Sequence, residues 1–119
     1  MNFENAIQIY IQWKKQLQNC IHHKTIGNLD ANHICQDNLC ELGEWLYGDH
    51  PEKISKDTVF KEIKEKHKRF HEITGKILKR IENNEALDPN KELGIESEYG
   101  KVSSKLIALL MRMRVKTSS

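Results

Sequence analysis

The sequence lacks any long hydrophobic run. Its longest clearly apolar stretch is LIALLM at residues 106–111, whereas a membrane-spanning helix needs roughly 20 apolar residues. The opening residues MNFENAIQIY have neither the basic start nor the apolar stretch of a signal peptide. The sequence therefore predicts a cytoplasmic protein that does not cross a membrane.

An excess of charge of one sign is also missing. The 119 residues include 19 Lys and Arg residues and 17 Asp and Glu residues, for a formal net charge of +2. Such a balance produces no strong surface field that would attract nucleic acid or an anionic membrane. We therefore expect neither of them as a partner.

Cysteine is scarce, with three residues in the chain. The reducing cytoplasm disfavours disulfides, so the thiols are expected to be buried, reactive or bound to a metal. Cys20 lies on the apolar face of the first predicted helix, where a thiol acts as a small buried hydrophobe. The other two cysteines, Cys35 and Cys40, lie in a more polar part of the chain.

Motifs of common enzyme classes are absent as well. The sequence has no glycine-rich phosphate loop, no serine-nucleophile motif and no conspicuous pair of catalytic carboxylates. The segment KHKRFHE holds two histidines, but Lys68 occupies the position of the glutamate base in the metallopeptidase motif HExxH. We therefore expect a protein that is not an enzyme.

Apolar residues recur every three or four positions through most of the chain, which is the spacing of one helix face. The pattern predicts helices over about 5–26 and 34–47, a third that starts near 55–58 and runs to about 81, and a fourth over about 97–116, with Gly27 ending the first. Segments rich in Gly, Pro, Asn and Asp separate them, and nothing predicts a strand. Four amphipathic helices in a chain of this length predict an all-α protein, with one domain over residues 1–119 folded as an antiparallel four-helix bundle.

The third predicted helix carries the clearest chemical signal. Its inward positions are predicted to be Phe60, Ile63, His67, Phe70, Thr74, Ile77 and Ile81. His67 and His71 are four residues apart, so both imidazoles lie on one face and can bind one metal ion. The alternative without a metal is one hydrogen-bonded core histidine and one exposed histidine.

A second signal is the segment CELGEWLYG at residues 40–48. Leucines at 39, 42 and 46 form the predicted packing face of its helix, and Cys40 and Gly43 lie on an adjacent stripe. A glycine there would let another helix approach the thiolate, while Trp45 anchors the helix in the core. Zinc favours mixed sulfur and nitrogen ligands, so Cys40 is a candidate third ligand.

These residues resemble the chemoreceptor zinc-binding (CZB) domain family. Its signature is a cysteine, two residues, glycine, one residue and tryptophan, followed by an aliphatic and an aromatic residue. This sequence matches the signature at Cys40, Gly43, Trp45, Leu46 and Tyr47, and the family's histidine pair at His67 and His71. Trp13 and Lys14 match a tryptophan and a basic residue of its first helix, and Tyr99 extends the resemblance over nearly the whole chain.

The resemblance implies a small helical bundle that binds Zn²⁺ through three histidines and one cysteine. Family members occur on bacterial chemoreceptors, on diguanylate cyclases and as free-standing proteins, often as homodimers. A homodimer that acts on a bacterial signalling protein is therefore expected. The implied inputs are free zinc and oxidation of the cysteine by hypochlorous acid. The 119 residues leave no room for an output domain, so the chain would signal to another protein or merely hold zinc.

One position departs from the family pattern, because Tyr10 stands where the first histidine is expected. The expected metal ligands are thus Cys40, His67 and His71, with Tyr10 as the candidate fourth. A phenol ligates poorly when neutral, and its ordinary pKa is about 10. Water at an open position, another histidine, a different metal or no metal remain alternatives. The corresponding alternative functions are a structural bundle with an empty site and a metal-dependent enzyme with an open coordination position.

Overall fold

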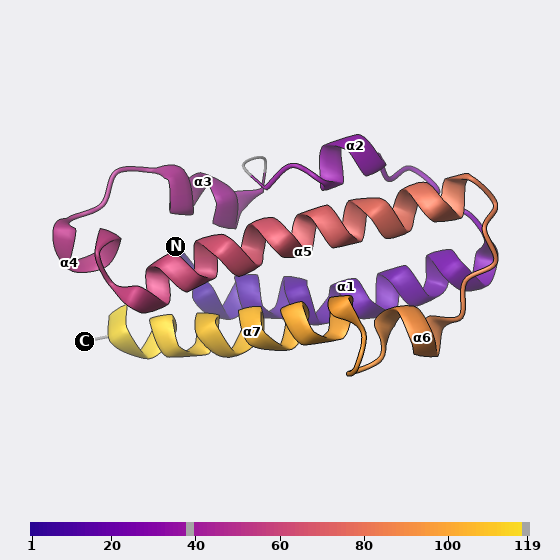
Figure 1. The fold of residues 1–119 in the computed structure, drawn as a ribbon. Coiled ribbons are helices and arrows are strands. Elements are labelled where there is room, and N and C mark those ends of the chain that lie inside the picture. The colour runs from indigo at the N-terminus through magenta and orange to yellow at the C-terminus, as the bar shows by residue number, and fades with distance from the viewer. Residues whose placement is uncertain (38–39, 118–119) are drawn as a thin grey trace.

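The computed structural model describes residues 1–37 and 40–117, and the regular elements in these ranges are all helices (Figure 1). They are α1 (Phe3–His23), α2 (Ala31–Ile34), α3 (Glu41–Tyr47), α4 (Glu52–Ser55), α5 (Thr58–Glu82), α6 (Pro89–Leu93) and α7 (Glu98–Thr117). The predicted all-α fold class is confirmed, while the single domain over residues 1–119 stays a prediction. No helix of the described chain combines the length and apolar character needed to cross a membrane.

The long helices α1, α5 and α7 lie along one another in a molecule of 46 × 25 × 20 Å (Figure 1). α1 and α5 run in the same direction, and α7 runs in the opposite direction. The short helices α2 and α3 lie along α5, on the side away from α7. Because α5 packs against α7, α2 and α3, its side chains can meet residues from both the long-helix core and the α2–α3 segment.

The prediction of a continuous helix over about 34–47 is wrong. α2 ends at Ile34, residues 35–37 are not helical, and α3 begins only at Glu41. Cys40 has extended backbone angles and caps α3, since its sulfur accepts a hydrogen bond from the Gly43 N–H at 3.3 Å. In the described residues, two short helices, α2 and α3, therefore stand in place of the second predicted helix. Leu39 of the predicted packing face lies outside the described residues.

The first predicted helix also ends earlier than expected. α1 stops at His23 because Lys24 adopts left-handed backbone angles and its N–H bonds to the carbonyls of Cys20 and Ile21. Gly27 has a φ of 60° but lies in the following turn, not at the helix end. The predicted third and fourth helices agree with α5 and α7 within one or two residues at each end.

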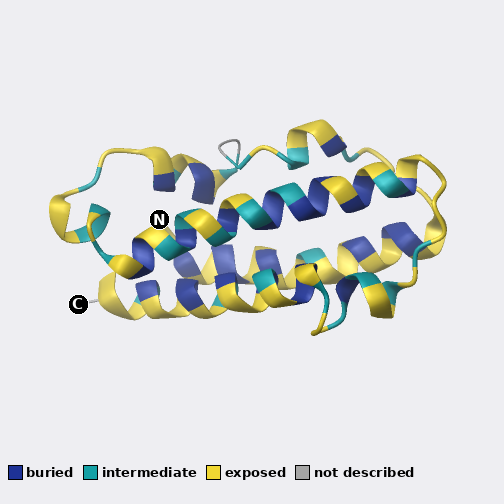
Figure 2. Cartoon of the chain, viewed as in Figure 1, coloured by how far each residue is buried: buried dark blue, intermediate teal, exposed yellow. Residues whose placement is uncertain are grey.

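Burial along α5 follows the predicted inward series (Figure 2). Every member of that series is buried, and the polar members His67 and Thr74 are 0 % exposed. Large apolar side chains of α1, α5 and α7 fill the core, each stabilising the fold by about 1.5–3 kcal/mol. α2 and α3 bury few residues by comparison, namely Ala31, Leu42, Gly43 and Leu46.

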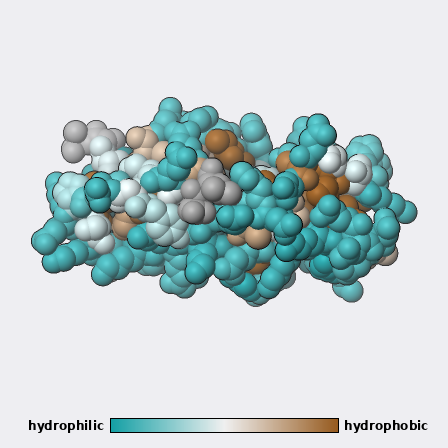
Figure 3. Space-filling view, turned by 90° about the horizontal axis from the view of Figure 1, so that it is seen from above, coloured by the Kyte–Doolittle hydropathy of each residue, from teal (hydrophilic) through white to brown (hydrophobic). Residues whose placement is uncertain are grey.

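The outer face that carries α2 and α3 is largely hydrophilic, with small apolar areas between polar side chains (Figure 3). Trp45 is half-buried on α3 and packs edge-on against Phe3 and Phe60, with ring centroids 5.2 and 5.4 Å away. This aromatic contact fixes the C-terminal part of α3 on the core, as predicted for an anchor. The N-terminal end of α3 is held differently, through Cys40.

Candidate metal centre

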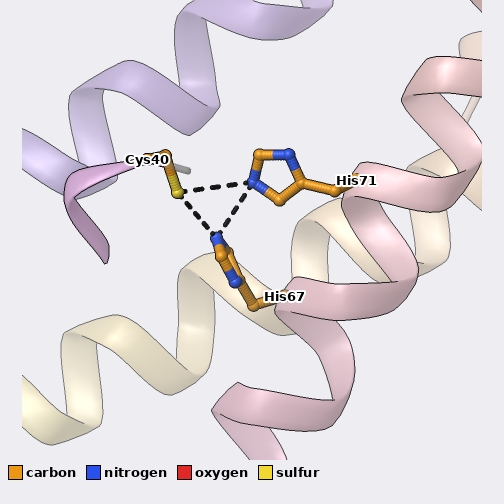
Figure 4. A group of neighbouring side chains, drawn as sticks. All are labelled: Cys40, His67 and His71. Carbon is orange, nitrogen blue, oxygen red and sulfur yellow. Dashed lines mark hydrogen bonds between the residues drawn. The ribbon is translucent and has the colours of Figure 1, made fainter. Parts of the chain in front are cut away.

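Four polar side chains from separate parts of the chain meet beside α5. Cys40 Sγ lies 3.2 Å from His67 Nε2 and 3.6 Å from His71 Nε2, and the two Nε2 atoms are 2.9 Å apart. Figure 4 shows the sulfur and both imidazoles pointing toward one common point. Tyr10 Oη completes the group at 2.8 Å from His67 Nε2, 3.2 Å from His71 Nε2 and 3.5 Å from Cys40 Sγ. The four residues that the sequence singled out thus lie together.

Cys40 is the half-buried member of the group. Burial raises the pKa of its thiol, but hydrogen bonds to His67 and His71 outweigh that effect and lower the pKa to about 5. A thiol with such a pKa is mostly thiolate near neutral pH, which is the form that binds metals. A cavity of about 40 Å³ adjoins Cys40 and Tyr10 and is also lined by Met1, Ala6, Ile9, Glu41 and Leu42.

His71 is oriented by the backbone of α2. Its Nδ1 lies 2.8 Å from the Ile34 carbonyl oxygen, and a carbonyl only accepts, so Nδ1 carries the proton and donates it. The Nε2 atom of His71, which faces Cys40 and Tyr10, is then the ring nitrogen whose lone pair a metal would use. This pairing of a backbone acceptor with the remote ring nitrogen is typical of metal-binding histidines.

His67 is fully buried, and its Nε2 atom lies within hydrogen-bonding distance of Tyr10, Cys40 and His71. Its Nδ1 atom has no hydrogen-bond partner among the described residues. All the polar contacts of His67 are therefore directed into the cluster. The alternative in which one histidine of the pair is exposed is ruled out, since His71 is only 5 % exposed.

Tyr10 reaches the cluster from α1 and is 3 % exposed. Its ring packs edge-on against Phe70, with centroids 5.0 Å apart, which fixes the direction of the hydroxyl. Burial, and then the charge of Cys40, raises the pKa of Tyr10 far above its ordinary value. Without a metal, Tyr10 is thus a neutral phenol that can donate to His67 or to the Cys40 sulfur.

The donor set and its spacing fit zinc. The six distances among Tyr10 Oη, Cys40 Sγ and the two Nε2 atoms run from 2.8 to 3.6 Å. In tetrahedral zinc sites, bonds of about 2.0–2.3 Å place neighbouring ligand atoms about 3.3–3.6 Å apart. The cluster is therefore only slightly more compact than a zinc site with one sulfur, two nitrogen and one oxygen ligand.

The other two cysteines of the chain, and the histidines at the end of α1, lie elsewhere. Cys35 caps the C-terminal end of α2, and its sulfur donates to the Asn32 carbonyl oxygen at 3.1 Å. Cys20, His22 and His23 occupy the last turns of α1, and Cys20 is part of the apolar core. In the described chain, only Cys40, His67 and His71 form a group of three or more His, Cys, Asp or Glu ligand atoms close enough to share a metal.

Comparison with known families agrees with this centre. Residues 11–78 match the family model of the chemoreceptor zinc-binding domain, which is more than half of the 119 residues. The chain belongs to the chemoreceptor zinc-binding domain family. The CZB match includes Cys40, His67 and His71 and begins one residue after Tyr10. The family and the cluster together fit a zinc-binding helical domain. Comparisons with curated proteins and with solved structures gave no significant match.

Two features of the centre were missed by the sequence analysis, namely the Ile34 carbonyl and Gly75 on α5. Every residue carries a carbonyl, so no pattern could single out that of Ile34. Gly75 did carry a signal, because glycine is unfavourable in the interior of a helix and should have a reason to be there. That reason is the close approach of α2 to α5 at this position.

Proposed function

We propose that this protein is a zinc-binding regulatory domain in which Cys40, His67, His71 and Tyr10 hold the metal. The observation that supports it most is the cluster itself, in which four donor atoms lie 2.8–3.6 Å apart although they come from three separate segments. When bound, zinc supplies a redox-inert cross-link between its ligands. The family, whose members are regulatory zinc-binding domains, agrees with this proposal.

Each side chain has a distinct part in holding the metal. Cys40 binds as the thiolate that its lowered pKa favours. His71 presents Nε2 because the Ile34 carbonyl holds the proton on Nδ1. His67 presents Nε2 from a fully buried position. Tyr10 contributes its oxygen, and phenol is the weakest of these ligands because burial disfavours the phenolate.

The proposed regulatory element is the α2–α3 segment. It buries few side chains, and Cys40 joins the start of α3 to α5 through the metal. Loss of zinc would release this joint and free the segment to move, which is an order–disorder switch. Elements with few buried contacts open at low free-energy cost. A partner that binds the outer face would then respond to the movement of the α2–α3 segment.

Two inputs suit this arrangement. One is the level of free zinc, and the other is oxidation of Cys40 by an oxidant such as hypochlorous acid, which replaces the thiolate by a sulfenate. Cys40 is the ligand best placed for oxidation, since it is half-buried beside a small cavity while both histidines are buried. We propose a bacterial signalling protein as the partner and a homodimer as the assembly.

The enzyme alternative has less support. A catalytic zinc keeps one coordination position open for water or substrate. Tyr10 Oη lies at 2.8–3.5 Å from the three other donor atoms and so occupies the place that such a water would need. A buried phenol in that place favours a closed, structural or sensory site.

The test of the proposed function is the metal content of protein purified without added metal. About one zinc per chain is expected in the wild type, and Cys40→Ala should lose it. Cys35→Ala is the matched control, because it removes a thiol from the same segment but outside the cluster. If wild type and Cys40→Ala both lack metal, the structural bundle with an empty site is correct instead.

A further inference from the structure

Helix α2 packs on α5 at Gly75, one turn beyond His71 of the centre. A Cβ atom at Gly75 would lie 2.5 Å from Cys35 Cβ, 3.0 Å from Cys35 Cα and 3.1 Å from the Ala31 carbonyl oxygen. Two of these three atoms belong to the backbone and cannot rotate away. Glycine at 75 is therefore what allows α2 to lie against α5 at this distance.

The same approach brings the Ile34 carbonyl to the site. Gly75 follows His71 by four residues, so both lie on one face of α5 and α2 covers them together. Ile34 precedes Cys35, whose Cα would contact any Cβ at Gly75. The distance of 2.8 Å between the Ile34 oxygen and His71 Nδ1 thus depends on the space that Gly75 leaves.

We propose that Gly75 and α2 form a positioning clamp for His71, in which α2 can reach the ring only because residue 75 has no side chain. The clamp rests on the proposed zinc function and adds a means of regulation to it. Docked α2 keeps the Nδ1 proton in place and aims Nε2 at the other ligands. Undocked α2 leaves His71 free to rotate and to change tautomer, which weakens metal binding. Gly75 and Ile34 are positioning residues, since neither contacts the metal.

The clamp makes α2 an exposed control element for a buried centre. Docking of α2 and binding of zinc favour each other, and such coupling is reciprocal by thermodynamic necessity. Zinc therefore protects the amides of Ile34 and Cys35, which close the single turn of α2 onto the carbonyls of Asp30 and Ala31. A partner that pulls α2 away from α5 would, by the same coupling, lower the affinity for zinc.

The test compares Gly75→Ala with wild type by competition of zinc against a chromophoric chelator. Loss of an outer partner of a metal-binding histidine typically lowers affinity about 10- to 100-fold, and that fall is expected here. Helix propensity alone favours alanine at position 75. A loss of zinc affinity in this variant therefore cannot result from a weaker helix. Gly94→Ala is the matched control, because it introduces a similarly close contact at the end of α6. Its Cβ would lie 2.4 Å from the carbonyl oxygen of Asn90. The control should keep wild-type zinc affinity.

A second readout separates positioning from simple loss of stability. In metal-free protein, ¹⁵N NMR of the imidazoles should show the His71 proton on Nδ1 in the wild type and a mixture of tautomers in Gly75→Ala. The double variant Gly75→Ala/Cys35→Gly removes the closest contact, Cys35 Cβ at 2.5 Å, and should recover part of the lost affinity.

The possible results distinguish the clamp from the proposed function. If the wild type binds zinc and Gly75→Ala binds it equally well with an unchanged His71 tautomer, the clamp is overturned while the zinc function stands. If the wild type binds no zinc, the zinc function is overturned and the clamp loses its role in affinity. In that case the NMR comparison alone decides whether α2 orients His71.

Discussion

At the scale of single residues, Tyr10 is the candidate ligand that differs in kind from the thiol and the two imidazoles. Its oxygen lies 2.8–3.5 Å from the three other donor atoms, so four donors meet in the cluster. A phenol can also donate a hydrogen bond to His67 or to the thiolate. Without a metal, the Tyr10 hydroxyl therefore provides a hydrogen bond to one of the buried acceptor atoms of the cluster. A ligand that can only accept could not do this.

Tyr10→Phe tests the phenol directly, since it removes the oxygen and keeps the ring against Phe70. Loss of a direct ligand should cost at least the roughly 10- to 100-fold in zinc affinity that is typical of an outer-shell partner. Zinc competition against a chromophoric chelator measures the change. Tyr99→Phe is the control, because Tyr99 is equally buried and its ring lies 5.4 Å from that of Phe70. Equal affinities of Tyr10→Phe and wild type would show that the phenol is not a ligand.

At the scale of helices, periodicity predicted the long elements and failed for the short ones. α1, α5 and α7 repeat apolar residues over five turns or more, so one missed position changes little. The region 34–47 also has helical spacing, but α2 ends at Ile34, and Cys40 takes extended backbone angles as the N-cap of α3. Cysteine is not among the preferred N-cap residues. The N-cap at Cys40 could therefore not be predicted from residue preference.

The centre was predictable to the extent that it depends on side chains. His67 and His71 share one face of a helix by spacing alone, and Cys40 followed from its motif. The position of Tyr10 depends on how α1 packs against α5, and the contact between Ile34 and His71 depends on how α2 does. Such contacts join residues more than 30 positions apart, and only the folded chain defines them.

A hydrogen-bonded ion pair ties the start of α5 to the end of α7. Asp57 caps α5 by accepting from the Val59 N–H at 2.7 Å, and its other oxygen lies 2.8 Å from Lys116 Nζ. The hydrogen bond to Lys116 and that to Val59 lower the pKa of Asp57. A carboxyl with a lowered pKa in the folded state stabilises the protein above its ordinary pKa of about 3.9, and this contribution is lost as the pH falls through the lowered value.

Asp57→Asn should therefore make the protein less sensitive to acid. Asparagine is an equally good N-cap, but it carries no charge for Lys116 and does not titrate. The difference in melting temperature between wild type and variant should be small, in favour of the wild type at pH 7, and should shrink as the pH falls below about 4. Thermal unfolding followed by circular dichroism from pH 7 to pH 2 measures it. A constant difference over that range would show that the pair does not couple to protonation of Asp57.

At the scale of the whole molecule, the apolar core and the metal centre both include side chains of α5, but they connect this helix to different elements. α7 lies outside the matched range 11–78, yet it packs along both α5 and α1 and encloses their apolar faces. We therefore expect the core of long helices to form without zinc. The centre adds a joint between this core and the α2–α3 segment, so the metal is expected to stabilise a bundle that already folds.

This division predicts how zinc changes thermal stability. A ligand that binds only the folded state stabilises it by about 2.7 kcal/mol when its free concentration is a hundred times its Kd. For a domain of this size, that free energy corresponds to a rise in Tm of roughly 10 °C. Calorimetry with buffered zinc and with a chelator measures the shift. The metal-free protein should still unfold in one cooperative transition, because the core of α1, α5 and α7 contains most of the buried apolar side chains.

Cys40→Ala gives this measurement its control. The variant keeps the long-helix core and should unfold near the Tm of the metal-free wild type, with no response to zinc. A zinc-dependent rise of equal size in Cys40→Ala would place the binding site elsewhere on the chain. Loss of cooperative unfolding in the metal-free wild type would mean that the long helices need the metal to pack. The centre would then be part of the core, and the α2–α3 segment could not move independently of it.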